Sequence, residues 1–413
     1  MLAPLAALSL LLSACGSSDE GPASPDEGGP EAEEHNEEPD EPSLGDPGIL
    51  VSDCSDGHHF GTPDSLSLTL FSAEDGSEIL ETEYTGEGIE HGESDVLSHG
   101  RAVQPTDAVG LPADCTTLER RLVPEHDLLL ATYEEEVSGN SVKGFGALSQ
   151  DGTFTALSPE QELSDFDEAA DHSNPVYDDV ENRIVFVEQL GEDHTVHAMD
   201  LEGGEVTELG TCESHECEDL SVPDGSGTPV IVTDIHGSDE SAQAAPGGSS
   251  LIVSENSRND GTLLTVLDLD AMDDTLPLVL DQEVLSPEDG PGDPVVVEVH
   301  GGVTAVVDEG TLLMSDNELS VWEFDDATLA DYAEEWGDEP SFEMEGLPVE
   351  RSLIPEGPRT NSQPAPSPDG SEVAFRSESD TGETSLYTVP FDGSDDPAEL
   401  TALSEDSIVH SWH

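Results

Sequence analysis

The sequence predicts an all-β fold, a β-propeller of six blades with seven as the alternative, behind a disordered acidic N-terminal tether. Glycine (39) and proline (29) are frequent among the 413 residues, which favours many turns over long helices. Apolar and polar residues alternate in stretches such as 65–71 and 384–390, the pattern of half-buried strands. A unit made of a turn and several strands recurs along the chain, which indicates a repeat architecture.

The repeat is clearest near the C-terminus, in QPAPSPDGSEVAF (363–375). When Val373, Ile184 and Leu251 are aligned, two copies have a proline nine residues earlier, Pro364 and Pro175. Two copies have a proline five residues earlier, Pro368 and Pro246. PDGSE and PGGSS each predict a tight turn that leads into an apolar strand. In all three copies a further strand, a D-x-x-G-like turn and another short strand follow.

The spacing of the copies predicts further units. Ile184 and Leu251 are 67 residues apart, and Leu251 and Val373 are 122 apart, so a copy is missing near residue 305. The segment 301–324 supplies three short strands there, segment 126–157 resembles another copy, and segment 65–80 the end of one more. Residues 48–413 divided by six give 61 residues a unit, against about 40–50 in typical blades, so the loops must be long.

The last residues, DSIVHSWH (406–413), resemble the first strand of a further unit and predict a strand that closes the ring with the N-terminal blade. A β-sandwich, or two unrelated β domains, is the alternative fold. Radial repetition explains the recurring unit, whereas a sandwich does not.

The stretch 363–401 resembles the TolB-type β-propeller repeat. Ser367-Pro368-Asp369-Gly370 matches the S-P-D-G of that repeat, and Asp200, Gly203 and Gly204 match its D-x-x-G-G in an earlier copy. Tyr177 keeps the aromatic residue of the pattern, whereas Pro366 replaces it in the last copy. The resemblance covers about 40 residues well and implies a propeller fold.

The N-terminus, LAPLAALSLLLSAC, is an apolar run that is too short to cross a bilayer as a mature helix and has the character of a secretory signal. Leu12-Ser13-Ala14-Cys15 resembles the bacterial lipobox, which implies a signal peptide over residues 1–14 and a lipid on Cys15. No Lys or Arg precedes the run, in contrast to the usual pattern. The resemblance places the chain on the outer face of the cytoplasmic membrane.

Residues 15–47 form the predicted tether, and residues 48–413 the propeller domain. From Gly16 to Pro47 the chain holds 12 acidic residues, no Lys or Arg, and almost nothing apolar. Such a composition cannot bury enough surface to offset the conformational entropy of the chain, so we expect disorder.

Acidic residues dominate the whole chain, with 96 Asp and Glu against nine Lys and Arg, a net charge of −87. The tether holds only 12 of these acids, so the domain itself is strongly anionic. Self-repulsion on this scale is screened at molar salt, where the Debye length falls to about 3 Å. Adaptation to high salt is the preferred interpretation, and a specific cationic partner is the alternative. No basic patch is present to neutralise phosphates, which excludes nucleic acid as a partner.

Five cysteines are present. With Cys15 assigned to the lipid, Cys54, Cys115, Cys212 and Cys217 remain as disulfide candidates in an exported protein. The simplest pairing is Cys212–Cys217 across a short loop, with Cys54–Cys115, and the other two pairings stay open.

No catalytic motif stands out. The G-x-S-x-G elbow of serine hydrolases is missing, and DLDAMDD lacks the glycine of a calcium loop. Of 14 histidines, His58, His59, His236 and His300 lie after strand-like runs or in turns and are the candidates for a zinc site, although no spacing motif supports one. No cofactor is firmly predicted, and calcium or zinc stays open.

These observations predict a non-enzymatic scaffold that binds a protein or a small ligand at the mouth of the propeller. One alternative is a zinc-handling lipoprotein that uses the histidines. A further alternative is a lyase or glycan-active enzyme of the propeller type, because such sites have no short linear signature.

Overall fold

The structure is a computed structural model of the whole chain, which divides into two compact units, Met1–Glu41 and Pro42–His413. The first unit and several loops lie outside the described residues. The structure describes residues 42–53, 65–86, 90–91, 100–102, 109–112, 118–137, 139–159, 169–212, 217, 220–223, 225–232, 240–244, 250–257, 261–268, 276–280, 295–299, 302–308, 311–316, 318–323, 349–355 and 357–413.

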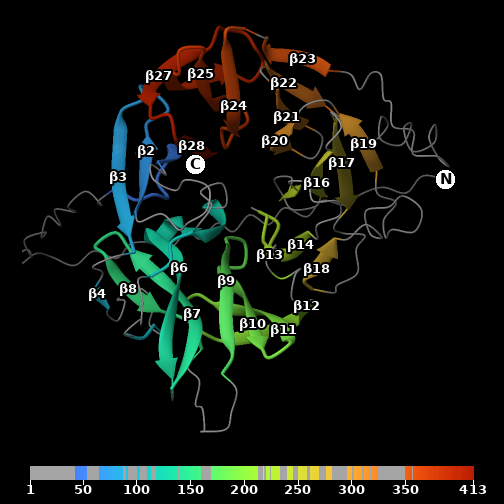
Figure 1. Cartoon of the computed structure of the whole chain (residues 1–413). Helices are drawn as coiled ribbons and strands as arrows, with labels where there is room; N and C mark the ends of the chain where they lie inside the picture. The colour runs from blue at the N-terminus through green and yellow to red at the C-terminus, as the bar shows by residue number, and fades with distance from the viewer. Residues whose placement is uncertain are drawn as a thin grey trace, which may run out of the picture. The chain divides into compact units, whose positions relative to one another are not determined.

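The described part of the chain is all-β, as predicted, with seven sheets named A to G here (Figure 1). Five of them are four-stranded and antiparallel. Their strands are given below in spatial order, so that each strand is hydrogen-bonded to the next one named. Sheet A is β28 (Ser407–Trp412), β1 (Ile49–Asp53), β2 (Ser65–Phe71) and β3 (Glu78–Thr85). Sheet C is β9 (Asp171–Asp178), β10 (Arg183–Leu190), β11 (Asp193–Asp200) and β12 (Val206–Cys212). Sheet E is β15 (Glu240–Ala244), β16 (Ser250–Ser257), β17 (Gly261–Asp268) and β19 (Val295–Val299).

Two further sheets complete the regular set. Sheet F is β20 (Gly302–Asp308), β21 (Thr311–Asp316), β22 (Glu318–Glu323) and β23 (Val349–Ile354). Sheet G is β24 (Arg359–Pro366), β25 (Glu372–Ser379), β26 (Thr384–Pro390) and β27 (Ala398–Leu403). The aligned residues Ile184, Leu251 and Val373 all fall on the second strand of their sheets, and the copy predicted near residue 305 is sheet F.

Sheets B and D depart from the regular pattern. Sheet B has five strands in the order β4 (Glu90–His91), β8 (Thr153–Ala156), β7 (Asn140–Ser149), β6 (Leu128–Val137) and β5 (Leu122–Val123). Sheet D has three, β13 (Leu220–Ser221), β14 (Val230–Val232) and β18 (Leu278–Leu280), and β18 pairs with β14 in parallel. Sheet D does not follow the predicted repeat, because its third strand comes from beyond β17.

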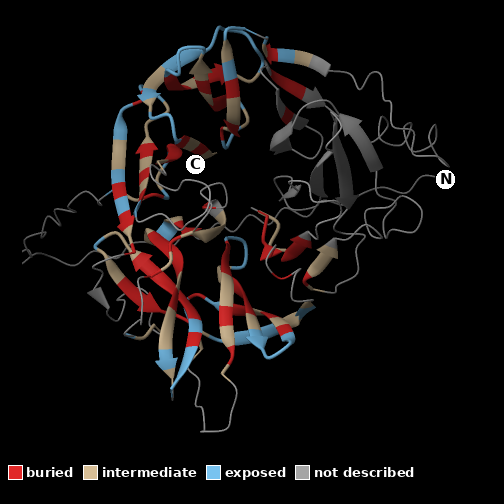
Figure 2. Cartoon of the chain, viewed as in Figure 1, coloured by how far each residue is buried: buried red, intermediate tan, exposed pale blue. Residues whose placement is uncertain are grey.

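Neighbouring sheets pack on one another through continuous apolar clusters, whose buried residues are red in Figure 2. One cluster joins sheets A and B, a second joins B and C, and a third joins C and D. Two more join F to G and G back to A, while β14 contacts β15 and β16 contacts β20. The order of packing therefore returns to sheet A, which fits a propeller.

The C-terminal strand β28 joins the N-terminal strand β1, as the sequence predicted. The register pairs Ile49 with Trp412 and Val51 with Val409, and the backbone of His413 exchanges hydrogen bonds of 2.9 and 3.2 Å with Gly48. Val409 packs with Ile49 and Val51 in the cluster between sheets G and A. The two ends of the domain thus share one sheet.

The D-G turns of the sequence form as tight turns with an aspartate that bonds to the backbone. The Asp369 carboxylate accepts the amide of Ser371 at 3.0 Å, and Gly370 has φ +68°, a conformation that glycine adopts without strain. Hydrogen bonds from Ser371 hold the pKa of Asp369 below its usual range. In three further turns the carboxylate of an aspartate accepts the backbone amide two residues later: Ser77 donates to Asp75, Thr153 to Asp151 and Ser394 to Asp392.

The structure adds two details at the N-terminal side. Leu44, which the sequence analysis placed in the tether, is fully buried, and its amide donates to the Asp127 carboxylate at 2.6 Å. Leu44 therefore belongs to the compact unit Pro42–His413. In the described ranges the helical segments are two 3-10 turns, η2 (Glu119–Arg121) and η3 (Pro124–His126), and no helix there is long and apolar enough to cross a membrane.

Candidate functional site

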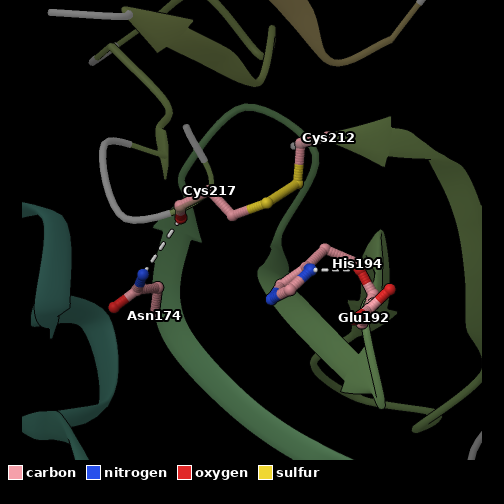
Figure 3. Close-up of a disulfide and its surroundings, with 5 residues drawn as sticks. All are labelled: Asn174, Glu192, His194, Cys212 and Cys217. Atoms are coloured by element: carbon pink, nitrogen blue, oxygen red, sulfur yellow. Dashed lines mark hydrogen bonds between the residues drawn. A yellow bond between two sulfur atoms is a disulfide. The ribbon is translucent and has the colours of Figure 1, made fainter. Parts of the chain in front are cut away.

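The disulfide between Cys212 and Cys217 is present, as predicted (Figure 3). It links the end of β12 to Cys217, which lies three residues before β13 and is buried in the same apolar cluster as Leu220 and Val222. The other predicted site residues, Cys15, Cys54, Cys115, His58, His59, His236 and His300, lie outside the described residues. Their roles stay predictions.

Within the described ranges, no group of three or more His, Cys, Asp or Glu side chains is arranged to hold a metal ion. Two histidines of β11 have different surroundings. His194 lies opposite Cys212, and its Nδ1 is 3.2 Å from the Glu192 carbonyl oxygen, whereas His197 stacks on Phe186.

The first strands of the sheets form two runs of contacting elements, which offer the best candidate for a site. We call β28, β5 with its preceding turn η2, β9, β13, β15, β20 and β24 the first-strand series. Contacts run from β28 to β24, from β24 to β20, from β20 to β15, from β13 to β9 and from β9 to η2. In a propeller the first strands of the blades surround the central channel.

Two amide side chains in the series make hydrogen bonds to backbone groups outside their own sheets. Asn174 on β9 donates through Nδ2 to the Cys217 carbonyl at 3.0 Å, as Figure 3 shows. Gln363 on β24 accepts the amide of Val409, on β28, at 3.0 Å. Both have positive φ (48° and 52°), although each precedes a proline, and both lie at bulges in their strands.

Asn174 and Gln363 occupy equivalent positions, ten residues before Ile184 and Val373. The prolines at this place mark the repeat in the sequence, whereas a role for the amides before them was not predicted. The Asn-Pro and Gln-Pro pairs were the available signal. The Gln363 side chain ties β24 to β28, and the Asn174 side chain ties β9 to the segment that precedes sheet D.

His410 on β28 is the most strongly perturbed histidine of the series. Its Nε2 lies 2.7 Å from the Ser52 hydroxyl of β1. Burial lowers the pKa of His410 to about 4, although part of the side chain remains exposed. Burial therefore disfavours the charged form of the His410 ring.

We therefore expect His410 to make the domain less stable in acid. The pKa of His410 is lower in the folded state than in the unfolded chain, where it is about 6.5. The stability that the neutral ring contributes is therefore fully present above pH 6.5 and is lost as the pH falls toward 4. Between pH 7 and pH 4 in molar NaCl, the wild type should lose up to about 3 kcal/mol more unfolding free energy than His410→Gln. Denaturant unfolding at several pH values measures this difference.

Ser52→Ala is the matched control, because it removes the hydroxyl and keeps the imidazole. This variant should retain the pH dependence of the wild type. Parallel curves for the wild type and His410→Gln would contradict the assignment.

A second group of titratable side chains lies on sheet C. The Glu188 carboxylate is 3.3 Å from His172 Nε2 and 3.6 Å from His197 Nε2, and the three residues come from neighbouring strands. Burial lowers the pKa of His172, with opposing contributions from Glu188. Phe186 contacts both rings, edge-on to His172 and stacked on His197, so the group is anchored in the cluster between sheets B and C.

No protein-family model matches the chain, and no curated protein matches it either. Solved propeller proteins are among its structural neighbours. An oligogalacturonate lyase in complex with manganese is 11% identical, with 81% of this chain and 72% of that chain covered and a TM-score of 0.34. TolB from Acinetobacter baumannii is 11% identical, with 84% and 68% covered and a TM-score of 0.28. A chain of a nidogen/laminin complex is 8% identical, with 88% and 96% covered and a TM-score of 0.34.

Proposed function

We propose that this protein is a lipid-anchored β-propeller that binds a protein or small ligand outside the cytoplasmic membrane, in surroundings of high salt. The observation that carries the proposal is the closed order of sheet packing, with β28 paired to β1, behind an N-terminal lipobox-like sequence. Propellers present variable loops and first-strand groups at the mouth of the channel, where ligands bind. The seven sheets favour the seven-blade alternative over the six blades of the sequence prediction.

The anchor and the binding function are tested together in cells grown at high salt. The wild type should fractionate with membranes and carry a lipid mass on its Cys15 peptide, and Cys15→Ser should appear in the medium. Carbodiimide coupling should then join the acidic domain, in the wild type, to amines of one recurring partner. Membrane retention of Cys15→Ser without a lipid mass would contradict the anchor.

The zinc-handling alternative is tested on the purified domain. A ligand that binds only the folded state raises the unfolding midpoint. A rise with micromolar zinc that His58→Ala/His59→Ala abolishes would replace the scaffold proposal with metal handling. An unchanged midpoint with zinc supports the scaffold.

A further inference from the structure

Two histidines and one glutamate share a single face of sheet C. In the register Glu188 of β10 lies directly opposite His172 of β9, and His197 of β11 lies opposite Phe186, two residues from Glu188. The Glu188 carboxylate faces the Nε2 atoms of both imidazoles, at 3.3 Å from His172 and 3.6 Å from His197. One anion therefore serves two rings that can each become cationic.

The two imidazoles differ in their access to water. The His172 side chain is only 2% exposed, against 14% for His197 and 35% for Glu188. Both rings pack on Phe186, which is fully buried and has its ring centroid 4.8 Å from that of Phe145 in sheet B. A positive charge on His172 would thus lie in the apolar interface between sheets B and C, where a charged group is costly.

Three charged groups act on His172. Within the described ranges they are Glu188 from β10, His197 from β11 and Asp171 from β9 itself. The elements β6, β7, β13 and η2 also pack against β9, and the backbone amide of Lys143 in β7 donates to the Asp171 carboxylate at 2.8 Å. Burial lowers the pKa of His172, the two carboxylates oppose this effect, and His197 adds to it.

We propose that His172, Glu188 and His197 form a proton-operated latch that holds β9 against sheet B. With the carboxylate ionised and both rings neutral the latch is negatively charged, and one added proton makes it neutral. A second proton leaves two cations beside one anion and charges the buried ring, so the two protonation steps are coupled and the second is disfavoured while β9 is packed. Opening of β9 hydrates His172 and lets it take up that proton, so acid favours the open state.

The opening would extend to the junction between sheets C and D. The strand that it releases also carries Asn174, whose Nδ2 donates to the Cys217 carbonyl ahead of sheet D. The latch therefore adds an acid response to the first-strand series. It depends neither on the lipid anchor nor on the identity of a ligand, so its failure would leave the scaffold function standing.

The first test is hydrogen exchange of the whole chain in molar NaCl, corrected for the intrinsic exchange rate at each pH. Between pH 7 and pH 5 the amides of β9 should exchange at least about tenfold faster, because an imidazole with an ordinary pKa of about 6.5 gains most of its charge in this range. The amides of β25 in sheet G should keep their protection, which separates local opening from global unfolding.

His172→Gln should remove the increase, because the amide still donates to Glu188 but takes up no proton. His194→Gln is the matched control: His194 is a buried histidine of β11 whose Nδ1 lies 3.2 Å from a backbone carbonyl rather than a carboxylate. This control should keep the increase. An equal increase in His172→Gln and the wild type, or its loss in His194→Gln, overturns the proposal.

The second test follows the ring protons of His172 by NMR between pH 8 and pH 4. Glu188→Gln should lower the pH at which His172 becomes charged by about one unit, because the ring loses its anion. His197→Gln should raise that pH by a similar amount, because the competing cation is removed. Titration midpoints of His172 that coincide in the wild type and both variants would show that the three side chains do not act together, which also overturns the proposal.

Discussion

The domain should unfold when salt is withdrawn. With 84 of the 96 acidic residues outside the tether, lowering NaCl from about 2 M to about 0.1 M lengthens the Debye length from about 2 Å to about 10 Å and exposes the carboxylates to one another. We expect the unfolding midpoint to fall steeply and the folded state to be lost at the lowest salt. Circular dichroism and thermal unfolding across a dilution series measure this.

Sucrose at matched osmolarity is the control, because it favours compact states without screening charge. Sucrose should not restore the fold at low NaCl. KCl should restore it when added to the ionic strength of the high-NaCl sample. A midpoint that stays within about 2 °C across the series would contradict salt adaptation, since about 1 kcal/mol already moves the midpoint of a large domain by a few degrees.

Removal of β28 should have an effect of similar size. Truncation after Asp406 deletes residues 407–413, leaves the edge of β1 without its partner, and opens the cluster that contains Ile49, Val51 and Leu386. Each large buried side chain that loses its packing costs about 2–5 kcal/mol, against a total stability of about 5–15 kcal/mol for a domain. We expect the truncated chain to be largely unfolded at the temperature at which the intact chain is folded.

A peptide of residues 404–413 provides the matched test. Added in trans to the truncated chain at high salt, it should restore the cooperative transition, because β28 is held by strand pairing and apolar contact. The same peptide with Val409→Asp should fail, since Val409 is only 5% exposed in the intact domain. An unchanged midpoint after truncation would show that β28 does not close the fold.

Local chemistry made much of this architecture predictable. Strand alternation and the D-G turns depend on residues close in sequence, so the strands of sheets C, E, F and G and the turn at Asp369 could be predicted directly. The closing strand was recognised because it continues the repeat. The Cys212–Cys217 disulfide was the simplest pairing because only four residues separate the two cysteines.

Contacts between distant residues decided the rest. Sheet D takes β18 from beyond β17 and pairs it in parallel with β14, so no local pattern announces it. The segment that carries β18 passes so close to Gly210 that an added Cβ would lie 2.1 Å from the Leu276 carbonyl oxygen, a constraint visible only in three dimensions. The environment of His410 likewise includes a residue distant in sequence, Ser52 on β1. Sequence alone determined the repeated strands and the turns, because these depend on residues close in the chain, and the charge, because it follows from composition. Tertiary structure decided which groups are removed from water together, because desolvation depends on everything that packs around a side chain.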